Sequence, residues 1–412
     1  KIFGKKMYKI KKSCRICNSK KLIKSYDLGF NPIGDDYSRT SNNAPLIPLE
    51  IQSCLNCNFK QLSTVVDENK VYGDYLYTTS TSKGLTKHFE NSCNFLIKKK
   101  YIKKNDFVLD IGSNDGSNLE IYRKKKFKVL GVEPAKDLCK IAEQKGIECI
   151  DSFFSKKVAK KILTNYGKPK LICVYNVFAN IDNLREFTKN LNTLCDEDTI
   201  VSIESFSLYG IIKNNLFDNI YHEHLSYFHV ENLKYFFKKF GLNIIYAENN
   251  TIKGGSIKIL LSRKYLKSIS LIRVIKDEKK LGIGKPYAFE KLKKINYENM
   301  IKISKFISNF KNSKIAGYGA SCGSTVLIHY YNLNNKLNLL LDDEPRRNNL
   351  FSPSTNISVK NPNQSILSKI DVIIIISWRY KKNILKNLKK RFPNLYKKIN
   401  IFQILPNIKK IN

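Results

Sequence analysis

The sequence predicts an α/β protein in three parts: a short cysteine-rich module, a central doubly wound parallel sheet and a second, smaller α/β unit at the C-terminus. Two Cys-x-x-Cys pairs lie near the N-terminus, and strand-like apolar runs alternate with helical stretches from about residue 101. The alternation starts again at residue 313. A chain of 412 residues suits two or three domains, each able to bury its own core.

The first element is the cysteine module. Cys14-x-x-Cys17 is followed, after 36 intervening residues, by Cys54-x-x-Cys57. Two such pairs can place four thiolates at the corners of a tetrahedron, which is the arrangement of a structural zinc site. Zinc would then contribute folding energy to a module with little core of its own. Cysteines buried together by chance are the alternative, and a catalytic zinc is disfavoured because four thiolates leave no position for water.

The other cysteines and the apolar runs indicate in which cellular compartment the protein is expected. Six cysteines are solitary: Cys93, Cys139, Cys149, Cys173, Cys195 and Cys322. This pattern predicts a reducing cytoplasm and one metal site, not a disulfide scaffold. The N-terminal segment lacks an apolar signal-peptide core, and the longest apolar run, at 371–377, is far short of the ~20 residues that cross a bilayer. We expect that run to be a buried strand, and the protein to be a cytoplasmic monomer without a membrane span.

The central part shows the rhythm of a doubly wound sheet. Apolar strands are predicted at 106–112, 128–134, 171–179 and 199–206, with helices after the first two. A helix that ends before Gly241 and two paired strands follow. Ligands of such sheets bind at the carboxyl ends of the strands.

Two acids at predicted strand ends indicate the cofactor. Asp110 precedes a glycine-rich segment that contains Gly112, Asn114 and Gly116 and does not match the Gly-x-Gly-x-x-Gly of dinucleotide-binding proteins. An acid at this place would repel a pyrophosphate but suits the cationic part of S-adenosylmethionine. Glu133, which ends the next strand, is placed to accept both ribose hydroxyls of an adenosine. The pair predicts S-adenosylmethionine; a Rossmann-like domain without catalysis is the alternative.

The C-terminal part begins with another glycine-rich loop. Gly317, Gly319 and Gly323 could cradle a phosphate at a helix N-terminus, or they could be required for packing, and the sequence leaves both interpretations open. The predicted domain limits are 1–72 for the cysteine module, 73–267 for the cofactor domain, 268–312 for a Lys-rich helical connector and 313–412 for the C-terminal domain.

The charge of the chain is strongly positive. Lys and Arg number 73 against 35 Asp and Glu, a formal net charge of +38. Such an excess attracts nucleic acid. Lys, Asn and Ile are however enriched along the whole length, and the basic residues lie in short scattered runs, which indicates solvated surfaces. We expect an anionic, phosphate-bearing substrate; a zinc-dependent nucleic-acid-binding protein is the non-enzymatic alternative.

Three of the five histidines fall within eight residues, at 222, 224 and 229. Imidazole is the natural base for a proton next to a carbonyl group, and Glu223 could fix its tautomer. In a turn, Tyr221 and His224 share a face whereas His222 points elsewhere and is expected to be structural. His229 is expected to begin a helix or to be buried. A metal site lacks the HExxH or HxxEH pattern, and a plain polar loop is the other alternative.

Several of these segments, taken in order, resemble one family. They are the two cysteine pairs around "YDLGFNPIGDDY", then "DYLYTTSTS", "VLDIGSNDGSNL", "YNVFANIDN", "YHEHLSYF" and "GYGASCGSTV". They resemble the S-adenosylmethionine-dependent sugar C-methyltransferases, which act on nucleotide-linked 4-keto deoxysugars. The resemblance covers nearly the whole chain. It implies a zinc-binding module, a class I methyltransferase sheet and a C-terminal Rossmann-like domain.

The resemblance also implies a reaction and residue roles. A base removes the proton alpha to the ketone of a dTDP-type 4-keto sugar, and the enolate carbon, C3, attacks the methyl group of the sulfonium. The base corresponds to His224, with Tyr221 and Glu223 beside it. Tyr77 falls at an active-site tyrosine of the family, and Asn176 falls where the family contacts the cofactor. The C-terminal lobe would hold part of the nucleotide.

One position departs from the family pattern. The family commonly has a histidine after the fourth strand, where this chain has Asn180. Asparagine can donate a hydrogen bond but cannot carry a proton near neutral pH. If the family histidine assists proton transfer or polarises the ketone, this chain can differ from the family in its substrate or in the carbon that it methylates. Asn180, Gly317 and Gly319 are the predicted substrate residues. An O- or N-methyltransferase acting on another nucleotide-linked or polar substrate is the alternative enzyme, and it would lose little activity on His224→Gln.

Overall fold

The computed structural model describes residues 7–41, 44–68, 71, 78–81 and 83–412. The chain divides into two compact units, each assembled from separate segments. The first contains Lys1–Ile23, Gln52–Asn214 and Leu225–Ala288, and the second contains Lys24–Ile51, Asn215–His224 and Phe289–Asn412. The four cysteines of the N-terminal pairs therefore belong to the first unit, and the Tyr-His-Glu-His segment belongs to the second.

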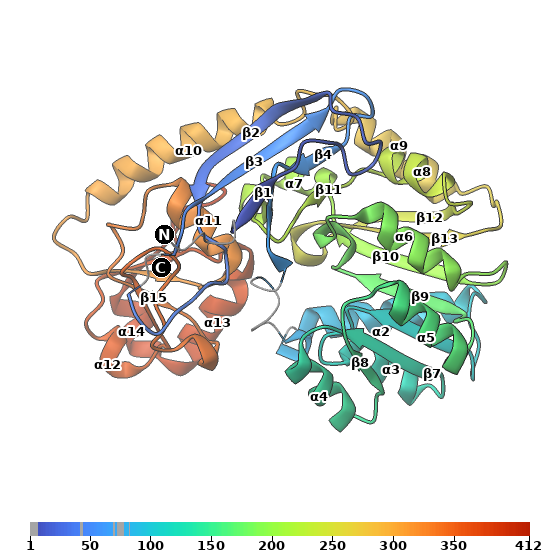
Figure 1. Cartoon of the computed structure of the whole chain (residues 1–412). Helices are drawn as coiled ribbons and strands as arrows, with labels where there is room; N and C mark the ends of the chain where they lie inside the picture. Colours follow the sequence, from blue (N-terminus) through green and yellow to red (C-terminus); the bar gives the residue numbers. More distant parts are fainter. Residues whose placement is uncertain (1–6, 42–43, 69–70, 72–77, 82) are drawn as a thin grey trace, which may run out of the picture. The chain divides into compact units, whose positions relative to one another are not determined.

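The first unit is built on a seven-stranded sheet with the order β12-β13-β10-β9-β6-β7-β8 (Figure 1). Its strands are β6 (Phe107–Ile111), β7 (Lys128–Glu133), β8 (Cys149–Asp151), β9 (Leu171–Tyr175), β10 (Ile200–Phe206), β12 (Asn243–Asn250) and β13 (Ser256–Ser262). The strands from β6 to β10 are parallel, and β13 is antiparallel to both of its neighbours. The strand order reverses between β6 and β9, so ligands are expected at the carboxyl ends of these two strands. The predicted doubly wound sheet is confirmed.

Helices cover this sheet because their apolar faces match its buried strands. They are α2 (Lys83–Lys98), α3 (Ser117–Lys124), α4 (Lys136–Gln144), α5 (Lys156–Tyr166), α6 (Leu184–Thr193), α7 (Leu208–Asn214), α8 (Val230–Lys238) and α9 (Ile269–Lys280). The helices α2 and α3 pack against each other over a core that includes Val108 and Leu171. Gly241 takes a φ of 70°, a conformation that glycine adopts easily, just after α8 ends.

The cysteine module has short strands. β1 (Tyr8–Ile10) pairs with β5 (Thr64–Val66), and β4 (Lys60–Leu62) pairs with β11 (Ser226–Tyr227), each in antiparallel fashion. The strands β2 (Leu22–Asn31) and β3 (Ile47–Cys54) each cross a boundary between the two units. Main-chain hydrogen bonds between β4 and β11 thus tie the module to the segment that follows Tyr-His-Glu-His (residues 221–224).

The second unit is built on a six-stranded sheet with the order β16-β15-β14-β17-β18-β19. The strands are β14 (Ile315–Tyr318), β15 (Leu339–Leu341), β16 (Ser358–Lys360), β17 (Val372–Ile375), β18 (Asn400–Gln403) and β19 (Lys409–Lys410), and all pairs except the last are parallel. The helices are α10 (Glu290–Ser308), α11 (Cys322–Tyr330), α12 (Gln364–Leu367), α13 (Lys381–Arg391) and α14 (Pro393–Lys398). In chain order the parallel strands run 3-2-1-4-5, which is a Rossmann-like arrangement. The strand predicted within 371–377 is β17, and it is buried as expected.

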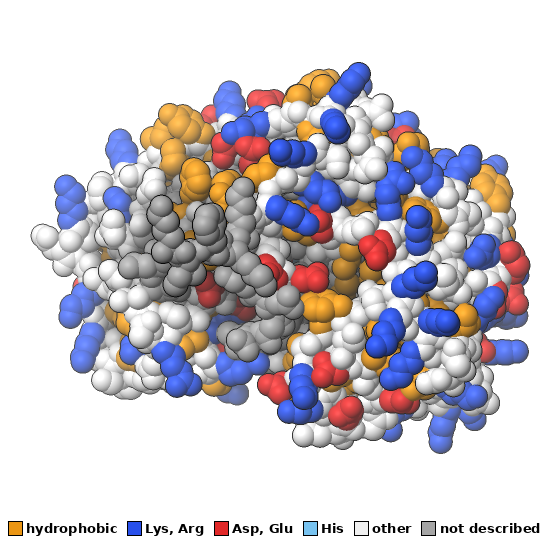
Figure 2. Space-filling model, in the orientation of Figure 1, with side chains coloured by type: hydrophobic (Ala, Val, Ile, Leu, Met, Phe, Trp, Pro, Cys, Tyr) orange, Lys and Arg blue, Asp and Glu red, His pale blue; other side chains and the backbone are white. Residues whose placement is uncertain are grey.

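The visible face of the molecule shows how the basic side chains are distributed there. On the face shown in Figure 2, Lys and Arg side chains alternate with acidic and neutral ones and do not gather in one patch. This agrees with the scattered basic runs of the sequence. Within the described residues, no helix combines the length and the apolar character that a membrane span requires.

Candidate active site

The four cysteines of the two pairs converge in the first unit. Their Sγ atoms all lie within 4.8 Å of one another, with 3.6 Å between Cys14 and Cys57 and 3.5 Å between Cys17 and Cys54. Sulfur ligands about 2.3 Å from a tetrahedral zinc ion lie about 3.8 Å apart, so the set fits Zn²⁺. With four thiolates the coordination is closed. The predicted structural zinc site is confirmed.

The zinc module is anchored to the loop that follows β9. Arg15, inside the first cysteine pair, is buried, and its Nε donates to Oδ1 of Asp182 at 3.1 Å. Asn232 of α8 donates to the carbonyl oxygen of Cys57 at 2.7 Å. The loop with Asp182 also carries Asn180, which ends the short helix η2 (Phe178–Asn180). The Arg15–Asp182 contact therefore ties the zinc module to the loop that carries Asn180.

Asp110 lies at the carboxyl end of β6, where a ligand is expected. Its side chain is 3% exposed, and Oδ2 accepts from Nδ2 of Asn118 at 2.9 Å. Burial raises the pKa of Asp110 to about 8, while the bond from Asn118 lowers it. Oδ1 is buried and has no hydrogen-bond partner in the part of the chain that the structure describes. A cationic ligand beside this group would favour its charged form.

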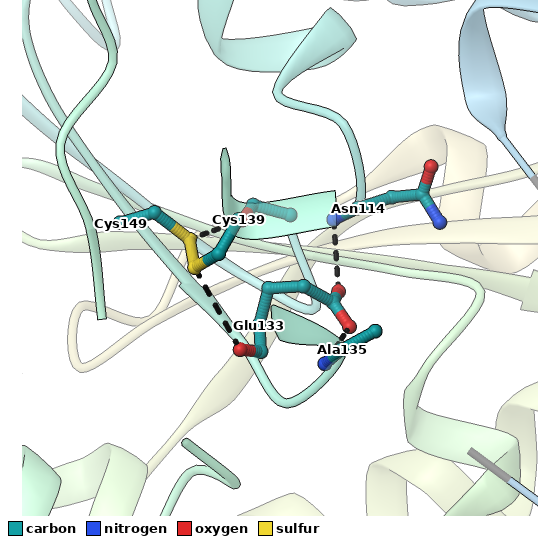
Figure 3. The surroundings of a disulfide bond; sticks show 6 residues. Asn114, Glu133, Ala135, Cys139 and Cys149 are labelled. Atoms are coloured by element: carbon teal, nitrogen blue, oxygen red, sulfur yellow. Dashed lines mark hydrogen bonds between the residues drawn. A yellow bond between two sulfur atoms is a disulfide. The ribbon is translucent and has the colours of Figure 1, made fainter. Parts of the chain in front are cut away.

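Glu133 ends β7 and is held by two main-chain amides (Figure 3). Its Oε2 accepts from the N–H of Asn114 and its Oε1 from the N–H of Ala135, both at 2.9 Å. Each carboxylate oxygen can accept a second hydrogen bond. The two amides fix the plane of the carboxylate, which suits a group that accepts two neighbouring ribose hydroxyls. Burial raises the pKa of Glu133, and the two amide bonds lower it.

The glycines of the first loop are required by its geometry. Gly112 has a φ of 75°, and a Cβ atom there would lie 2.2 Å from Cγ2 of Val177. Gly116 has a φ of 74° and precedes α3. Asn114 between them also has a positive φ, of 52°. The turn therefore brings main-chain atoms close to the strand ends, where the cofactor is expected.

Asn176 follows β9 at the same edge of the sheet. Its φ is 59°, and its N–H donates to the carbonyl oxygen of Glu204 at 2.7 Å. The side chain of Asn114 accepts from the N–H of Thr79 at 2.9 Å, so the segment before α2 contacts the glycine-rich loop at 112–116. Tyr77, predicted for the active site, lies outside the described residues. The first unit thus brings together the predicted cofactor residues Asp110, Gly112, Asn114, Gly116, Glu133 and Asn176 at one sheet edge.

A disulfide bond lies beside Glu133, and Sγ of Cys139 lies 3.9 Å from the carbonyl oxygen of Glu133 (Figure 3). It joins Cys139 of α4 to Cys149 of β8, whose Cα atoms are 5.6 Å apart. The expectation that all six solitary cysteines are reduced is therefore wrong for this pair. The chain reverses between α4 and β8, and this reversal brings two cysteines ten positions apart into bonding range. Among the described residues, the other four are free thiols.

The histidine turn of the second unit is a compact polar structure. The N–H of His224 donates to the carbonyl of Tyr221 at 2.9 Å, and their ring centroids are 3.9 Å apart. Nδ1 of His224 lies 2.8 Å from the carbonyl oxygen of Asn219. Oε1 of Glu223 accepts from Sγ of Cys322, the first residue of α11, at 3.5 Å. The expected shared face of Tyr221 and His224 is present.

The neighbouring histidines are buried. Nε2 of His222 lies 3.3 Å from the carbonyl oxygen of Pro48, and burial lowers the pKa of His222 to about 4. His229 precedes α8, and burial lowers its pKa to about 3. Across the described ranges, the metal-ligand cluster that the structure contains is the cysteine set. The alternative of a histidine-bound metal at this turn gains no support.

Asp218 is an interacting residue that the sequence did not reveal. Its carboxylate accepts from Nε1 of Trp378 at 3.2 Å and from Nη1 of Arg379 at 3.1 Å. Trp378 and Arg379 belong to η6 (Trp378–Tyr380), directly after β17. The partners are 160 and 161 positions from Asp218, so no local pattern could indicate the contact.

His88 and Glu204 form a second unpredicted pair, in the first unit. Nε2 of His88 on α2 lies 2.8 Å from Oε2 of Glu204 on β10, which is 2% exposed. Lys258 of β13 is the antiparallel pairing partner of Glu204. Its Nζ donates a hydrogen bond to Oγ of Ser92, which lies one helical turn after His88. The pair joins α2 to the carboxyl edge of the sheet beside Asn176.

The C-terminal glycines lie in tight surroundings. A Cβ atom at Gly317 would lie 2.6 Å from Cδ2 of Leu340, and one at Gly319, where φ is 111°, would lie 2.0 Å from Oγ of Ser377. The N–H of Ala320 donates to Oδ2 of Asp342 at 2.6 Å. Packing thus accounts for both glycines, and a carboxylate already accepts from one amide of the loop.

Known proteins match the chain along most of its length. Three family models match in succession: a zinc binding domain over residues 14–72, a methyltransferase domain over 90–247 and a C-methyltransferase C-terminal domain over 251–395. C-methyltransferase NovU of Streptomyces niveus is 24% identical over 390 residues, which are 92% of this chain and 93% of NovU.

Solved structures match the central part. A SAM-dependent methyltransferase of Archaeoglobus fulgidus is 20% identical, with a TM-score of 0.34, over 43% of this chain and 94% of that one. Magnesium protoporphyrin IX methyltransferase of Synechocystis, with bound SAM, is 13% identical, with a TM-score of 0.34, over 48% of this chain and 89% of that one.

Proposed function

The chain belongs to the S-adenosylmethionine-dependent C-methyltransferase family that its sequence resembles, and on that premise we propose that it methylates C3 of a nucleotide-linked, dTDP-type 4-keto deoxysugar. The reaction replaces the C3–H bond by a C3–CH₃ bond and releases one proton. A base must therefore accept the C3 proton, and we assign this role to His224.

The hydrogen bond between His224 and Asn219 carries the proposal. A carbonyl oxygen only accepts, so Nδ1 of His224 must hold a proton and donate it to Asn219 across 2.8 Å. In the neutral imidazole Nε2 then holds the lone pair. The main chain therefore fixes the tautomer that a general base needs.

The other residues of the turn would support the charge that develops. When Nε2 removes the C3 proton, the electron pair of the C–H bond moves onto C3 and the ketone oxygen. The hydroxyl of Tyr221, whose ring packs on His224, is the donor that we assign to this oxygen. Glu223 is 7% exposed, and its negative charge would favour the imidazolium that forms.

The first unit would hold the methyl donor. Asp110 and Glu133 fit the cationic and ribose parts of S-adenosylmethionine, and Asn176 lies at the same edge. When bound, this cofactor supplies an electrophilic methyl group. The enolate carbon would accept this methyl group, so that one carbon–carbon bond replaces one carbon–sulfur bond and a neutral thioether would be released. Asn180 is the residue that we expect to determine which sugar is accepted.

Hydrogen–deuterium exchange tests this function. The zinc-loaded protein is incubated in D₂O with S-adenosylhomocysteine and each of several dTDP-4-keto sugars, and the C3 proton is followed by NMR. We expect wild-type washout, and a decrease by about 10² to 10⁴ in His224→Gln, as for the loss of a general base. His329→Gln is the control, since His329 of the same unit bonds to the carbonyl of Pro353. Exchange in His224→Gln at the wild-type rate would refute the assignment.

A further inference from the structure

Asp218 has an unusual environment for an acid that has no part in the mechanism above. Its side chain is 4% exposed, and its two carboxylate oxygens have different donors, Trp378 on Oδ2 and Arg379 on Oδ1. A carboxylate held at both oxygens by an indole N–H and a guanidinium has a fixed orientation. Arg379 is itself largely buried, at 21% exposed. Ordinary surface ion pairs do not have this geometry.

The place of Asp218 in the chain connects this pair to the proposed base. Asp218 lies in η3 (Phe217–Asn219), directly before the residue whose carbonyl holds Nδ1 of His224. The ring of Phe217 packs against Tyr330 and Tyr331, with centroids 5.1 and 5.3 Å apart. The residue whose carbonyl determines the tautomer of His224 is therefore preceded by the buried ion pair of Asp218 and by the two aromatic contacts of Phe217.

The other end of the turn is held by the same sheet. Glu223 accepts from Cys322, which follows β14, while Asp218 is held by residues that follow β17. The strands β14 and β17 are adjacent and parallel, so both loops lie at one edge of the six-stranded sheet. A Cβ atom at Gly323 would lie 2.9 Å from the carbonyl oxygen of Asp218, so the start of α11 also contacts this residue.

We propose that Asp218 is a positioning residue, held in place by the hydrogen bonds from Trp378 and Arg379. It keeps the carbonyl oxygen of Asn219 in contact with Nδ1 of His224, so that Nε2 remains the basic nitrogen. This inference rests on the proposed function. The C-terminal sheet then contributes to proton removal through the orientation of the base. None of the three residues needs to touch the substrate for this role.

The change Asp218→Asn tests the role directly. It preserves the shape of the side chain but removes the charge and turns one oxygen into an NH₂ group, which faces an N–H donor. With its anchor weakened, the Asn219 carbonyl can move off Nδ1. We expect the rate of C3 exchange to fall by about 100-fold, the loss that follows a misplaced catalytic group. The affinity for S-adenosylmethionine, whose site is in the other unit, should not change.

Nitrogen NMR of labelled histidine gives a readout that does not depend on the substrate. In the wild type, His224 should show the tautomer with the proton on Nδ1, with its signals identified by their absence in His224→Gln. Asp218→Asn should show a mixture of tautomers and a displaced pH–rate profile. Trp378→Phe removes the hydrogen bond from the indole N–H to Asp218 and changes no charge, so it should show the same mixture of tautomers to a smaller extent. This variant replaces Asp218→Asn in the test if Asp218→Asn does not fold.

A matched ion pair of the same unit provides the control. Asp343 accepts from Arg391 at 2.8 Å, but its side chain is 37% exposed. Asp343→Asn should leave the tautomer and the exchange rate unchanged. An unchanged His224 tautomer in both Asp218→Asn and Trp378→Phe would overturn the inference, whereas absent exchange in the wild type with every sugar would refute the proposed function alone.

Discussion

The burial of Asp110 predicts that cofactor binding depends on pH. With a pKa of about 8 in the free protein, the carboxyl group is about half ionised at pH 8 and about 1% ionised at pH 6. A sulfonium or ammonium group favours the ionised form, so binding must remove the proton at low pH. The affinity for S-adenosylmethionine should therefore rise about 50-fold from pH 6 to pH 8, or about 2.3 kcal/mol. Burial also raises the pKa of Glu133, which acts in the same direction.

Titration calorimetry at several pH values measures this dependence. In buffers that differ in ionisation enthalpy, the heat should show uptake of a proton by the buffer at pH 6 and less uptake at pH 8. The variant Asp110→Asn should bind more weakly at pH 8 and lose most of the dependence, with the remainder due to Glu133. An affinity that is flat between pH 6 and pH 8 in the wild type would refute the reasoning about Asp110.

Three further predictions concern the first unit. Cys54→Ser should lose the zinc and melt at a lower temperature, as measured by a chromogenic chelator and circular dichroism. Glu133→Gln should weaken S-adenosylmethionine binding about 10- to 100-fold, since hydrogen bonds to a charged group contribute ~1.5–3 kcal/mol, while the exposed Glu143→Gln should not. Gly112→Ala should abolish binding through the 2.2 Å clash with Val177, whereas Gly84→Ala, with nothing within 4 Å, should bind normally. Equal affinities within either of these pairs would contradict the assigned cofactor site.

The features that the sequence predicted well are local ones. A Cys-x-x-Cys pair places two ligands on one turn, so two pairs suffice to indicate a zinc site. The position of Asp110 and Glu133 follows from where an apolar run ends, because parallel strands bring their carboxyl ends to one edge. The spacing of Tyr221 and His224 likewise indicates a shared face, because residues three positions apart in a turn lie on the same side.

The features that were missed depend on distant parts of the chain. The His88–Glu204 contact spans 116 positions and the Asp218–Arg379 contact spans 161, so neither leaves a periodic signal. The two helices α9 and α10 belong to different units, although both lie in one Lys-rich stretch of uniform composition. The predicted domain limits, which follow such composition shifts, stay a prediction.

The disulfide shows a different limit of sequence reasoning. Cys139 lies on the buried side of α4 and Cys149 on a strand, and each position alone is typical of a solitary cysteine in an apolar segment. Only the packing of the helix onto the strand places the two sulfur atoms together. The cytoplasmic location and the monomeric state stay predictions from the sequence.

The position of the transferred methyl group tests the central claim most directly. The protein is incubated with S-adenosylmethionine labelled with ¹³C in the methyl group and with a dTDP-4-keto deoxysugar, and the product is analysed by carbon and proton NMR. We predict a labelled methyl group bonded to C3, loss of the C3–H signal, and formation of this product about 10²- to 10⁴-fold more slowly in His224→Gln. A labelled methyl group on oxygen or nitrogen, or a C-methyl product formed by His224→Gln at the wild-type rate, would contradict this prediction.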